Sequence, residues 1–195
     1  MKRLPPEYYL HPDVVFLARD LLGKALMTNI DGKGVTGGII VETEAYAGET
    51  DRASHAYGGR RTRRTETIYQ KGGVAYIYLC YGMHHLFNVV TNIEGIPHAI
   101  LIRGIKPIIG QELMAHRTGK RPEKLQTLNG PGKLTKALGI TTRQDKTFLY
   151  DNNIWIEETS LQSNEKQIIS GPRIGVDYAG EHAQWPYRFS LLLTG

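Results

Sequence analysis

The segment Gly37–Tyr46, with the sequence Gly-Gly-Ile-Ile-Val-Glu-Thr-Glu-Ala-Tyr, constrains the fold more than any other part of the chain. Apolar, β-branched residues after a glycine break predict a β-strand, in which alternate side chains share a face. The face that carries the acids would be formed by Ile40, Glu42, Glu44 and Tyr46. The core face would be formed by Ile39, Val41, Thr43 and Ala45. A carboxylate beside an aromatic ring on a rigid strand indicates a general base.

The rest of the chain predicts further strands and few helices. Helical spacing and stop signals predict helices at Pro12–Leu22, Ile108–Thr118 and Lys133–Leu138. Strands are expected at Lys24–Thr28, Val74–Cys80, Leu86–Thr91, Ala99–Ile105, Ile154–Glu158, Gln167–Ser170, Ile174–Val176 and Tyr187–Leu193. Because these strands do not alternate regularly with helices, we expect an α+β fold. It would be a single domain over residues 1–195, with a curved, mostly antiparallel β-sheet and surrounding helices.

A protruding β-hairpin is expected around Tyr81-Gly82-Met83, which reads as a turn between two strands. A bulky tyrosine followed by glycine at a tight turn can project from the protein. Such a ring can wedge into a base stack and hold open the gap left by an extruded nucleotide. The alternative is a turn aromatic that packs on its own hairpin.

Tyrosine is concentrated before this turn, since six of the eleven tyrosines lie between Tyr46 and Tyr81. Alternation places Tyr76 and Tyr78 on the same face of their strand. Aromatic planes near basic residues suit the stacking of a flat base. The alternative is that these rings fill the core, as aromatic residues in strands commonly do.

The long, glycine-bearing segment Ala47–Gly73 contains four arginines in five positions, Arg60, Arg61, Arg63 and Arg64. Long irregular segments within compact domains are often functional. With a net charge of +5 for the chain, this run is typical of a contact with phosphates. A solvated surface loop is the alternative.

The chain offers little for other kinds of chemistry. Its one cysteine, Cys80, lies in an apolar strand pattern and is expected to be a buried core thiol. The seven histidines lack metal-binding spacing, and His84 and His85 point in opposite directions in an extended chain, so we expect no metal site. No signal peptide and no apolar run of about 20 residues is present, which predicts a soluble, cytoplasmic protein without a membrane partner.

Taken together, these segments resemble the alkyladenine (3-methyladenine) DNA glycosylase family, in a compact bacterial form. The resemblance rests on Val41–Tyr46, His55, Gly58–Arg60, Tyr76–Tyr78, Tyr81–Met83, Asn88, Leu101–Arg103, Gly130–Leu134 and Arg173–Val176, and it covers nearly the whole chain. Asn129 departs from the serine of mammalian members, so no serine contact is carried over there.

The resemblance implies base-excision repair of double-stranded DNA by a monomer that needs no cofactor. A damaged purine (3-methyladenine, 7-methylguanine, hypoxanthine or etheno-adenine) would be flipped out of the duplex. Water would then cleave its N-glycosidic bond, without lyase activity. An alkylated purine is cationic, so its glycosidic bond is weak and its stacking on tyrosines is strengthened.

Residue roles follow from the same resemblance. Glu44 matches the general base that activates water, and Arg103 an arginine near that water. The base pocket would be formed by Tyr46, His55, Tyr78 and Asn88, of which Asn88 crowds the exocyclic amine of guanine. The intercalating residues would be Tyr81 and Met83. The phosphate contacts would be Arg60, Arg61, Arg63 and Arg64.

Two other functions stay open from the residues alone. A glycoside hydrolase could use Glu42 and Glu44 as paired acids, since residues two apart on a strand lie about 6.5 to 7 Å apart. A non-enzymatic nucleic-acid binding module could use the basic loop and the tyrosines. The arginine run and the wedge turn argue against the first, and an acid within a phosphate-binding face argues against the second.

Overall fold

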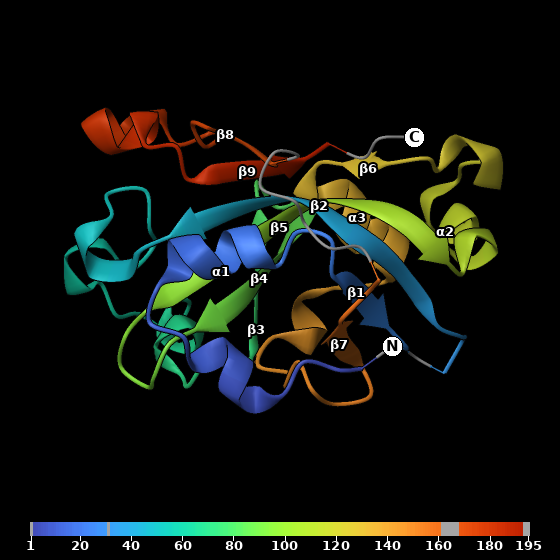
Figure 1. Ribbon diagram of the computed structural model, residues 1–195, viewed down its shortest axis with the longest axis horizontal. Coiled ribbons are helices and arrows are strands. Elements are labelled where there is room, and N and C mark those ends of the chain that lie inside the picture. The colour runs from blue at the N-terminus through green and yellow to red at the C-terminus, as the bar shows by residue number, and fades with distance from the viewer. Residues whose placement is uncertain (1, 31, 161–167, 193–195) are drawn as a thin grey trace.

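The strand that carries both acids, β2 (Thr36–Tyr46), lies inside the sheet of the computed structural model, which describes residues 2–30, 32–160 and 168–192. Within these residues one nine-stranded antiparallel sheet runs in the order β3-β4-β5-β2-β1-β7, as Figure 1 shows. Strand β6 pairs with β5, and β9 joins β2 to β8. The other strands are β1 (Ala25–Thr28), β3 (Ala75–Cys80), β4 (His84–Thr91), β5 (His98–Ile109), β6 (Leu128–Asn129), β7 (Ile154–Glu157), β8 (Ile168–Gly171) and β9 (Arg188–Leu191).

Strand β2 changes its partner on one side halfway along its length. Residues 36–39 pair with β1, whereas residues 42–44 pair with β9. On the other side β5 follows the strand from Gly37 to Tyr46. Only glycine fits at Gly38, because an added Cβ would lie 2.8 Å from the backbone oxygen of Lys106. The glycine pair thus lets β5 approach at the start of the strand.

A β-bulge at Glu42 corrects part of the predicted alternation. The register shifts between Ile40 and Glu42 and again between Glu42 and Thr43. Ile40 therefore joins Ala45 in the main core and does not share the face of the acids. Ile39 and Val41 belong to a separate apolar cluster that contains Ala25, Met27 and Trp155. The first shift adds a residue on β2, Val41, and the second adds one on β5, Arg103, so the alternation of β2 changes across Glu42.

Three α-helices accompany the sheet in the described residues: α1 (Val14–Asp20), α2 (Gln111–Thr118) and α3 (Pro131–Leu138). Helix α1 starts later than predicted because the Asp13 carboxylate accepts hydrogen bonds from the amides of Val15 and Phe16, both at 2.9 Å. Helix α2 also starts later, since Ile108 and Ile109 extend β5 as far as a left-handed glycine, Gly110. Short 3₁₀ helices occur at Pro6–Leu10, Gly48–Thr50, Tyr57–Gly59, Glu66–Tyr69, Pro122–Lys124, Thr142–Gln144 and Asp177–Gln184.

The α+β fold class and the antiparallel sheet are confirmed. One predicted strand, Ile174–Val176, is wrong, because this segment is irregular and turns its backbone toward β2. Gln167, the first residue of one predicted strand, and Leu193, the last residue of another, lie outside the described residues.

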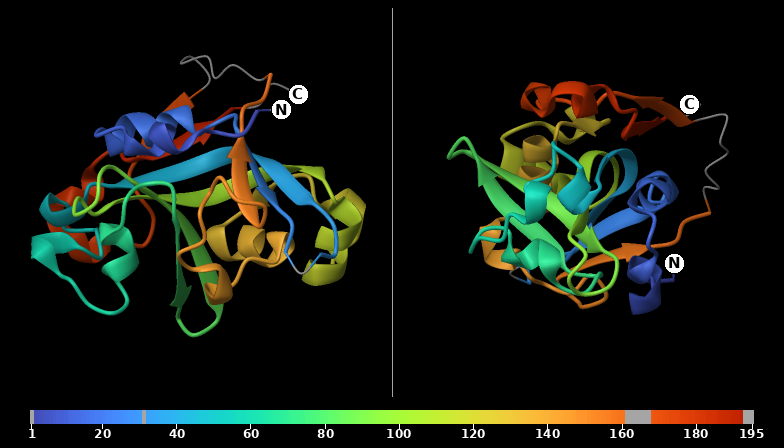
Figure 2. Two further views of the ribbon diagram at one scale, coloured as in Figure 1. Left: turned by 90° about the horizontal axis from the view of Figure 1, so that it is seen from below. Right: turned by 90° about the vertical axis from the view of Figure 1, so that its left-hand side faces the viewer.

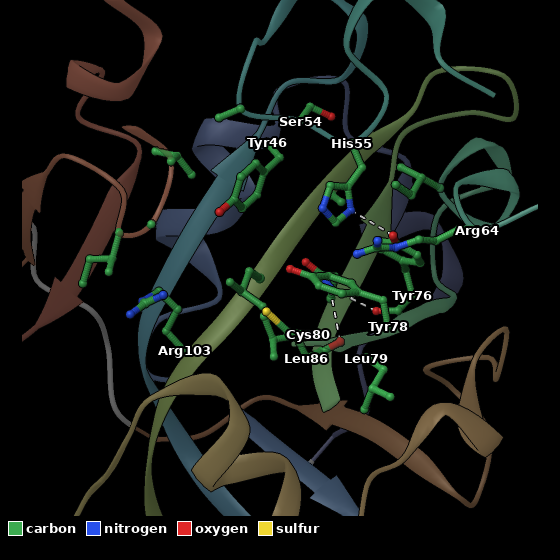
Figure 3. Close-up of a pocket in the computed structure, with 18 of the residues that line it drawn as sticks. Tyr46, Ser54, His55, Arg64, Tyr76, Tyr78, Leu79, Cys80, Leu86 and Arg103 are labelled. Atoms are coloured by element: carbon green, nitrogen blue, oxygen red, sulfur yellow. Dashed lines mark hydrogen bonds between the residues drawn. The ribbon is translucent and has the colours of Figure 1, made fainter. Parts of the chain in front are cut away.

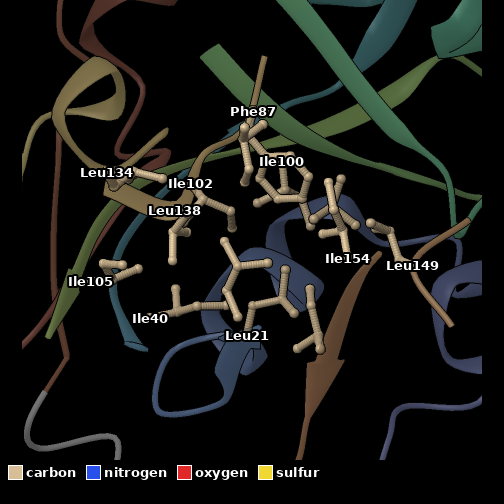
Figure 4. Close-up of a cluster of buried hydrophobic side chains, with 14 of the residues drawn as sticks. Leu21, Ile40, Phe87, Ile100, Ile102, Ile105, Leu134, Leu138, Leu149 and Ile154 are labelled. Atoms are coloured by element: carbon tan, nitrogen blue, oxygen red, sulfur yellow. The ribbon is translucent and has the colours of Figure 1, made fainter. Parts of the chain in front are cut away.

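The main core joins α1 and α3 to the sheet (Figure 4). Leu21, the residue that caps the end of α1, and Leu138 from α3 are both fully buried in it, together with Ile40 and Ile105 from the sheet. This cluster fixes the central strands, and therefore fixes the backbone that carries the acids.

The hairpin of β3 and β4 projects from the body, as predicted and as both views of Figure 2 show in green. The first residues of β4, which directly follow the turn, are held by α3 and the segment after it. Thr135 donates a 2.7 Å hydrogen bond to the backbone oxygen of His85, and the amide of Thr142 donates to the His85 ring. Gly132 lies against His84 so closely that an added Cβ would meet the ring at 2.9 Å. The start of β4 is therefore held against the body of the protein, whereas Tyr81 and Met83 in the turn before it are exposed.

Candidate active site

A pocket of about 410 Å³ lies between the hairpin, the strands β2 and β5, and the irregular segments that follow β2 and β8. Figure 3 shows Tyr46 and Arg103 on one side, and His55, Arg64, Tyr76 and Tyr78 on the other. This volume falls within the range of small-ligand sites.

One wall of the pocket is aromatic. The rings of Tyr76 and Tyr78 lie 5.4 Å apart, and the His55 ring lies 4.8 Å from Tyr78. The two tyrosines therefore share a face, as the alternation of β3 predicts. The Nδ1 atom of His55 is hydrogen bonded to the Tyr76 hydroxyl at 2.9 Å, which brings the loop histidine to the pocket as expected.

These aromatic side chains carry no charge at neutral pH. Burial, and after it the nearby charges of Arg64 and Arg60, lower the pKa of His55 to about 4. Burial raises the pKa of Tyr76 to about 12 and raises that of Tyr78 well above its usual range. The wall therefore offers neutral rings and hydroxyl groups to a ligand.

Glu44 lies behind the opposite wall and is fully buried. Its Oε1 accepts a 2.8 Å hydrogen bond from the amide of Ile174, and its Oε2 accepts a 2.7 Å bond from the Tyr46 hydroxyl. Burial raises the pKa of Glu44, while Arg103, the Ile174 amide and Tyr46 oppose that rise. Tyr46, Arg103 and Ile174, which contact Glu44, themselves line the pocket, so Glu44 lies directly beside it.

Arg103 connects the two acids of β2. Its Nε lies 3.4 Å from Oε1 of Glu42 and also 3.4 Å from Oε1 of Glu44. Glu42 has a second partner, Arg188, at 3.1 Å. Arg103 faces both the pocket and a second hollow of about 700 Å³ that Glu42 lines. The two acids therefore lie in different environments. Glu44 is fully buried beside the pocket, and Glu42 lines the second hollow.

A buried ion pair that the sequence did not predict, Arg173 with Asp51, holds this wall. The Arg173 guanidinium binds both carboxylate oxygens of Asp51, one at 2.9 Å, and also donates to the backbone oxygen of Ala45 at 2.9 Å. Both side chains are fully buried, and the guanidinium lies 4.9 Å from the centre of the Tyr46 ring. The pair fixes the backbone next to Ile174. Arg173 begins one of the segments that carry the resemblance, but nothing in that segment reveals the pairing, because 122 positions separate it from Asp51.

The hairpin tip is bare. Tyr81 is 90% exposed and Met83 is 71% exposed, so Tyr81 does not pack on its own hairpin. Tyr81 has a φ of 50° and Gly82 a φ of 70°, which makes the tight turn. Tyr81 also lines the pocket, and the tip therefore borders the aromatic wall.

The four arginines of the loop occupy different environments. Arg61 forms an ion pair with Glu66 at 2.6 Å and lies over the Tyr69 ring. Arg64 lines the pocket, with its guanidinium 4.9 Å from the centre of the Tyr78 ring. Arg60 and Arg63 are exposed, and their guanidinium groups pair with no acid in the described part of the chain. All four are exposed, and Arg64 is the one of the four that lines the pocket.

Two further residues that line the pocket, Asn88 and Cys80, lie on the strands of the hairpin. The side-chain amide of Asn88 donates to the backbone oxygen of Tyr76 at 3.1 Å, and the residue lines the pocket. Cys80 is half-buried and also lines the pocket, so the expected core thiol is wrong. The end of β3 leaves the core to form the hairpin, and its last residues lose their cover.

Within residues 2–30, 32–160 and 168–192, no cluster of His, Cys, Asp and Glu could hold a metal ion. In the same residues, no helix is long and apolar enough to cross a membrane.

A base-sized aromatic pocket, a buried carboxylate behind it and an exposed apolar tip beside it define a class of enzyme that acts on an extruded nucleotide. The comparisons agree with this class. Residues 8–192 match the family model described as methylpurine-DNA glycosylase (MPG). The chain therefore belongs to the methylpurine-DNA glycosylase family.

Several bacterial relatives are similar over almost their full length, and each bears the name "Putative 3-methyladenine DNA glycosylase". One from Chlamydia felis is 47% identical over 190 residues, covering 96% of this chain and 95% of the relative. One from Desulfitobacterium hafniense is 44% identical over 198 residues, covering 98% and 96%. One from Bacillus cytotoxicus is 43% identical over 195 residues, covering 96% and 95%.

Proposed function

We propose that this protein excises alkylated and deaminated purines from duplex DNA by hydrolysis of the N-glycosidic bond, with Glu44 as the base that activates water. Family membership makes it a DNA-3-methyladenine glycosylase of base-excision repair. The proposal adds the range of lesions (3-methyladenine, 7-methylguanine, hypoxanthine and etheno-adenine), the residue roles and the mechanism. The buried Glu44 beside an aromatic pocket is the observation that carries it.

The pocket has the shape and chemistry for a flipped purine. Tyr46 on one side and His55 with Tyr78 on the other can sandwich a flat base, and stacking on aromatic rings tolerates many bases. Asn88, fixed by its bond to β3, stands where it can crowd an exocyclic amine. Discrimination against normal guanine then follows from shape.

Glu44 suits a general base for two reasons. A carboxylate can accept about four hydrogen bonds, and Glu44 accepts two, from Ile174 and Tyr46, with Arg103 at ion-pair distance, so acceptor capacity is left for a water molecule. Its raised pKa also makes the anion a stronger base, since proton abstraction is most efficient when the pKa lies near the working pH. The same negative charge would stabilise an oxocarbenium-like sugar in the transition state.

Water is the expected nucleophile. No lysine is found among the described residues that line the pocket, so an amine attack with a Schiff base, and the strand cleavage that follows it, has no candidate residue there. Arg103 would hold Glu44 in place and help to orient the water.

The exposed tip would replace the extruded nucleotide. Tyr81 and Met83 expose large apolar side chains next to the pocket, as an intercalating wedge requires. Arg60, Arg61 and Arg63 lie on the loop next to the pocket, where they would contact phosphates, whereas Arg64, the fourth arginine predicted to do so, lines the pocket itself. The partner would be a damaged duplex bound by a single copy of the chain.

Release of free base from a duplex that contains one damaged purine tests the proposal. We expect Glu44→Gln to lower kcat by about 10²- to 10⁴-fold, the range of general base catalysis, with DNA binding retained. Glu42→Gln is the matched control on the same strand and should lose far less. An equal loss in both variants would contradict the assignment to Glu44. Binding without release by the wild-type protein would favour a binding module.

A further inference from the structure

Arg64 occupies a place in the pocket that a purine would need. Its guanidinium lies 4.9 Å from the centre of the Tyr78 ring and it lines the pocket beside His55 (Figure 3). A cation over an aromatic face is attracted by the ring. Tyr78 is one of the rings on which the proposed substrate would stack, so Arg64 already holds part of the cation–π site.

The charge of Arg64 is not balanced by an acid. The other arginine of the pocket, Arg103, lies 3.4 Å from both Glu42 and Glu44 and is neutralised by them. No carboxylate of the described residues lies within ion-pair distance of Arg64, whereas its neighbour Arg61 is paired with Glu66. The aromatic groups between are neutral at pH 7, because the pKa of His55 is low and those of the tyrosines are high. Arg64 therefore sets the sign of the potential on this side of the pocket.

Purine lesions differ in how they meet such a charge. Hypoxanthine is neutral and presents the acceptors O6 and N7, the pair to which arginine commonly donates two hydrogen bonds. In 7-methylguanine the methyl group blocks N7 and gives the base a positive charge while it is attached to the sugar. A guanidinium therefore attracts hypoxanthine and repels the cationic 7-methylguanine.

We propose that Arg64 is a specificity-determining residue that favours neutral purine lesions over cationic ones. The proposal rests on the proposed function and deepens it, since it states which lesions the same pocket prefers. Cationic lesions can still be excised when Arg64 swings away from Tyr78, which its exposed position allows.

The test compares excision of hypoxanthine and of 7-methylguanine, each placed opposite cytosine in the same duplex. Arg64→Gln removes the charge and keeps a side chain of similar shape. We expect it to raise the ratio of kcat/KM for 7-methylguanine over hypoxanthine by about tenfold, a change equivalent to about 1.4 kcal/mol. Arg64→Lys keeps the charge and should leave the ratio nearer to that of the wild type.

Arg63→Gln is the matched control, because Arg63 is exposed and lies outside the pocket. It should leave the ratio unchanged. If Arg64→Gln lowers kcat/KM for both lesions equally and weakens their salt dependence, Arg64 is a phosphate contact and the proposal is overturned. A ratio that also changes in Arg63→Gln overturns it as well.

The preference of Arg64 for one lesion over the other can also be measured by DNA binding, without catalysis. On a Glu44→Gln background, Arg64→Gln should shift the relative affinity for the two duplexes in the same direction. If the wild-type protein releases neither base, the proposed function fails. The affinity ratio then still decides whether Arg64 discriminates by charge.

Discussion

The wall of the pocket around Glu44 and the hairpin tip across from it are built in opposite ways. The carboxylate wall (Glu44, Arg103, Ile174, Arg173 and Asp51) is a network of charged and hydrogen-bonded groups, most of them fully buried. The hairpin tip, Tyr81 to Met83, is apolar and exposed, and backbone turn geometry alone shapes it.

This difference separates stability from function. Removing one member of a buried charged network leaves its partner buried without compensation, so the carboxylate wall and the fold depend on each other. An exposed side chain at a turn contributes little to stability. Substitutions at the tip should therefore leave the stability of the fold unchanged, whereas substitutions in the wall should lower it. Variants at the tip are expected to affect activity alone, and variants in the wall to affect stability.

The largest effect is expected from the buried pair. Asp51→Asn leaves the fully buried Arg173 guanidinium without its counter-charge, and we expect a loss of about 3–5 kcal/mol in the free energy of unfolding. Urea denaturation followed by circular dichroism measures it. Asp151→Asn, a change at an exposed aspartate, is the control and should change stability by less than about 0.5 kcal/mol. A loss as small as this in Asp51→Asn would show that the wall does not depend on the pair.

A smaller effect, on activity only, is expected at the tip. Tyr81→Ala should lower kcat/KM on a damaged duplex by about 10- to 100-fold, because extrusion of a base costs a few kcal/mol that the wedge helps to supply. Its stability should stay that of the wild type, since Tyr81 is 90% exposed. Tyr150→Ala, at an exposed tyrosine outside the pocket, is the control. An equal loss on duplex and on isolated nucleosides would rule out the wedge.

The smallest effect is a shift in pH dependence at Glu42. Its negative charge raises the pKa of Glu44 and competes for Arg103, so Glu42→Gln should lower the pKa of Glu44. Because Glu44 must be ionised to act, the acid limb of the plot of kcat/KM against pH should move to lower pH. Glu158→Gln, an exposed carboxylate paired with Lys24, is the control. A limb that stays in place or moves to higher pH would contradict this coupling.

Sequence periodicity predicted much of the fold and the membership of the pocket. The strand at β2, the hairpin and the shared face of Tyr76 and Tyr78 were all visible as local patterns. The resemblance added His55 and Asn88, which do line the pocket, although their roles stay predictions. The strand, the hairpin and the shared face of the two tyrosines depend on residue spacing along one element, and such spacing can be read directly from the sequence.

The amino-acid sequence by itself determined the strands, the exposed turn at Tyr81 and the neighbouring acids of β2. Only the tertiary structure decided which acid is sealed: the bulge at Glu42 sets the faces, and an amide 130 positions away holds Glu44. It also decided that Arg64 enters the pocket while Arg63 faces outward. The physical reason is the separation along the chain of the groups that interact. Side-chain alternation follows from local backbone geometry, whereas burial, pairing and pKa depend on groups that meet only after the chain has folded.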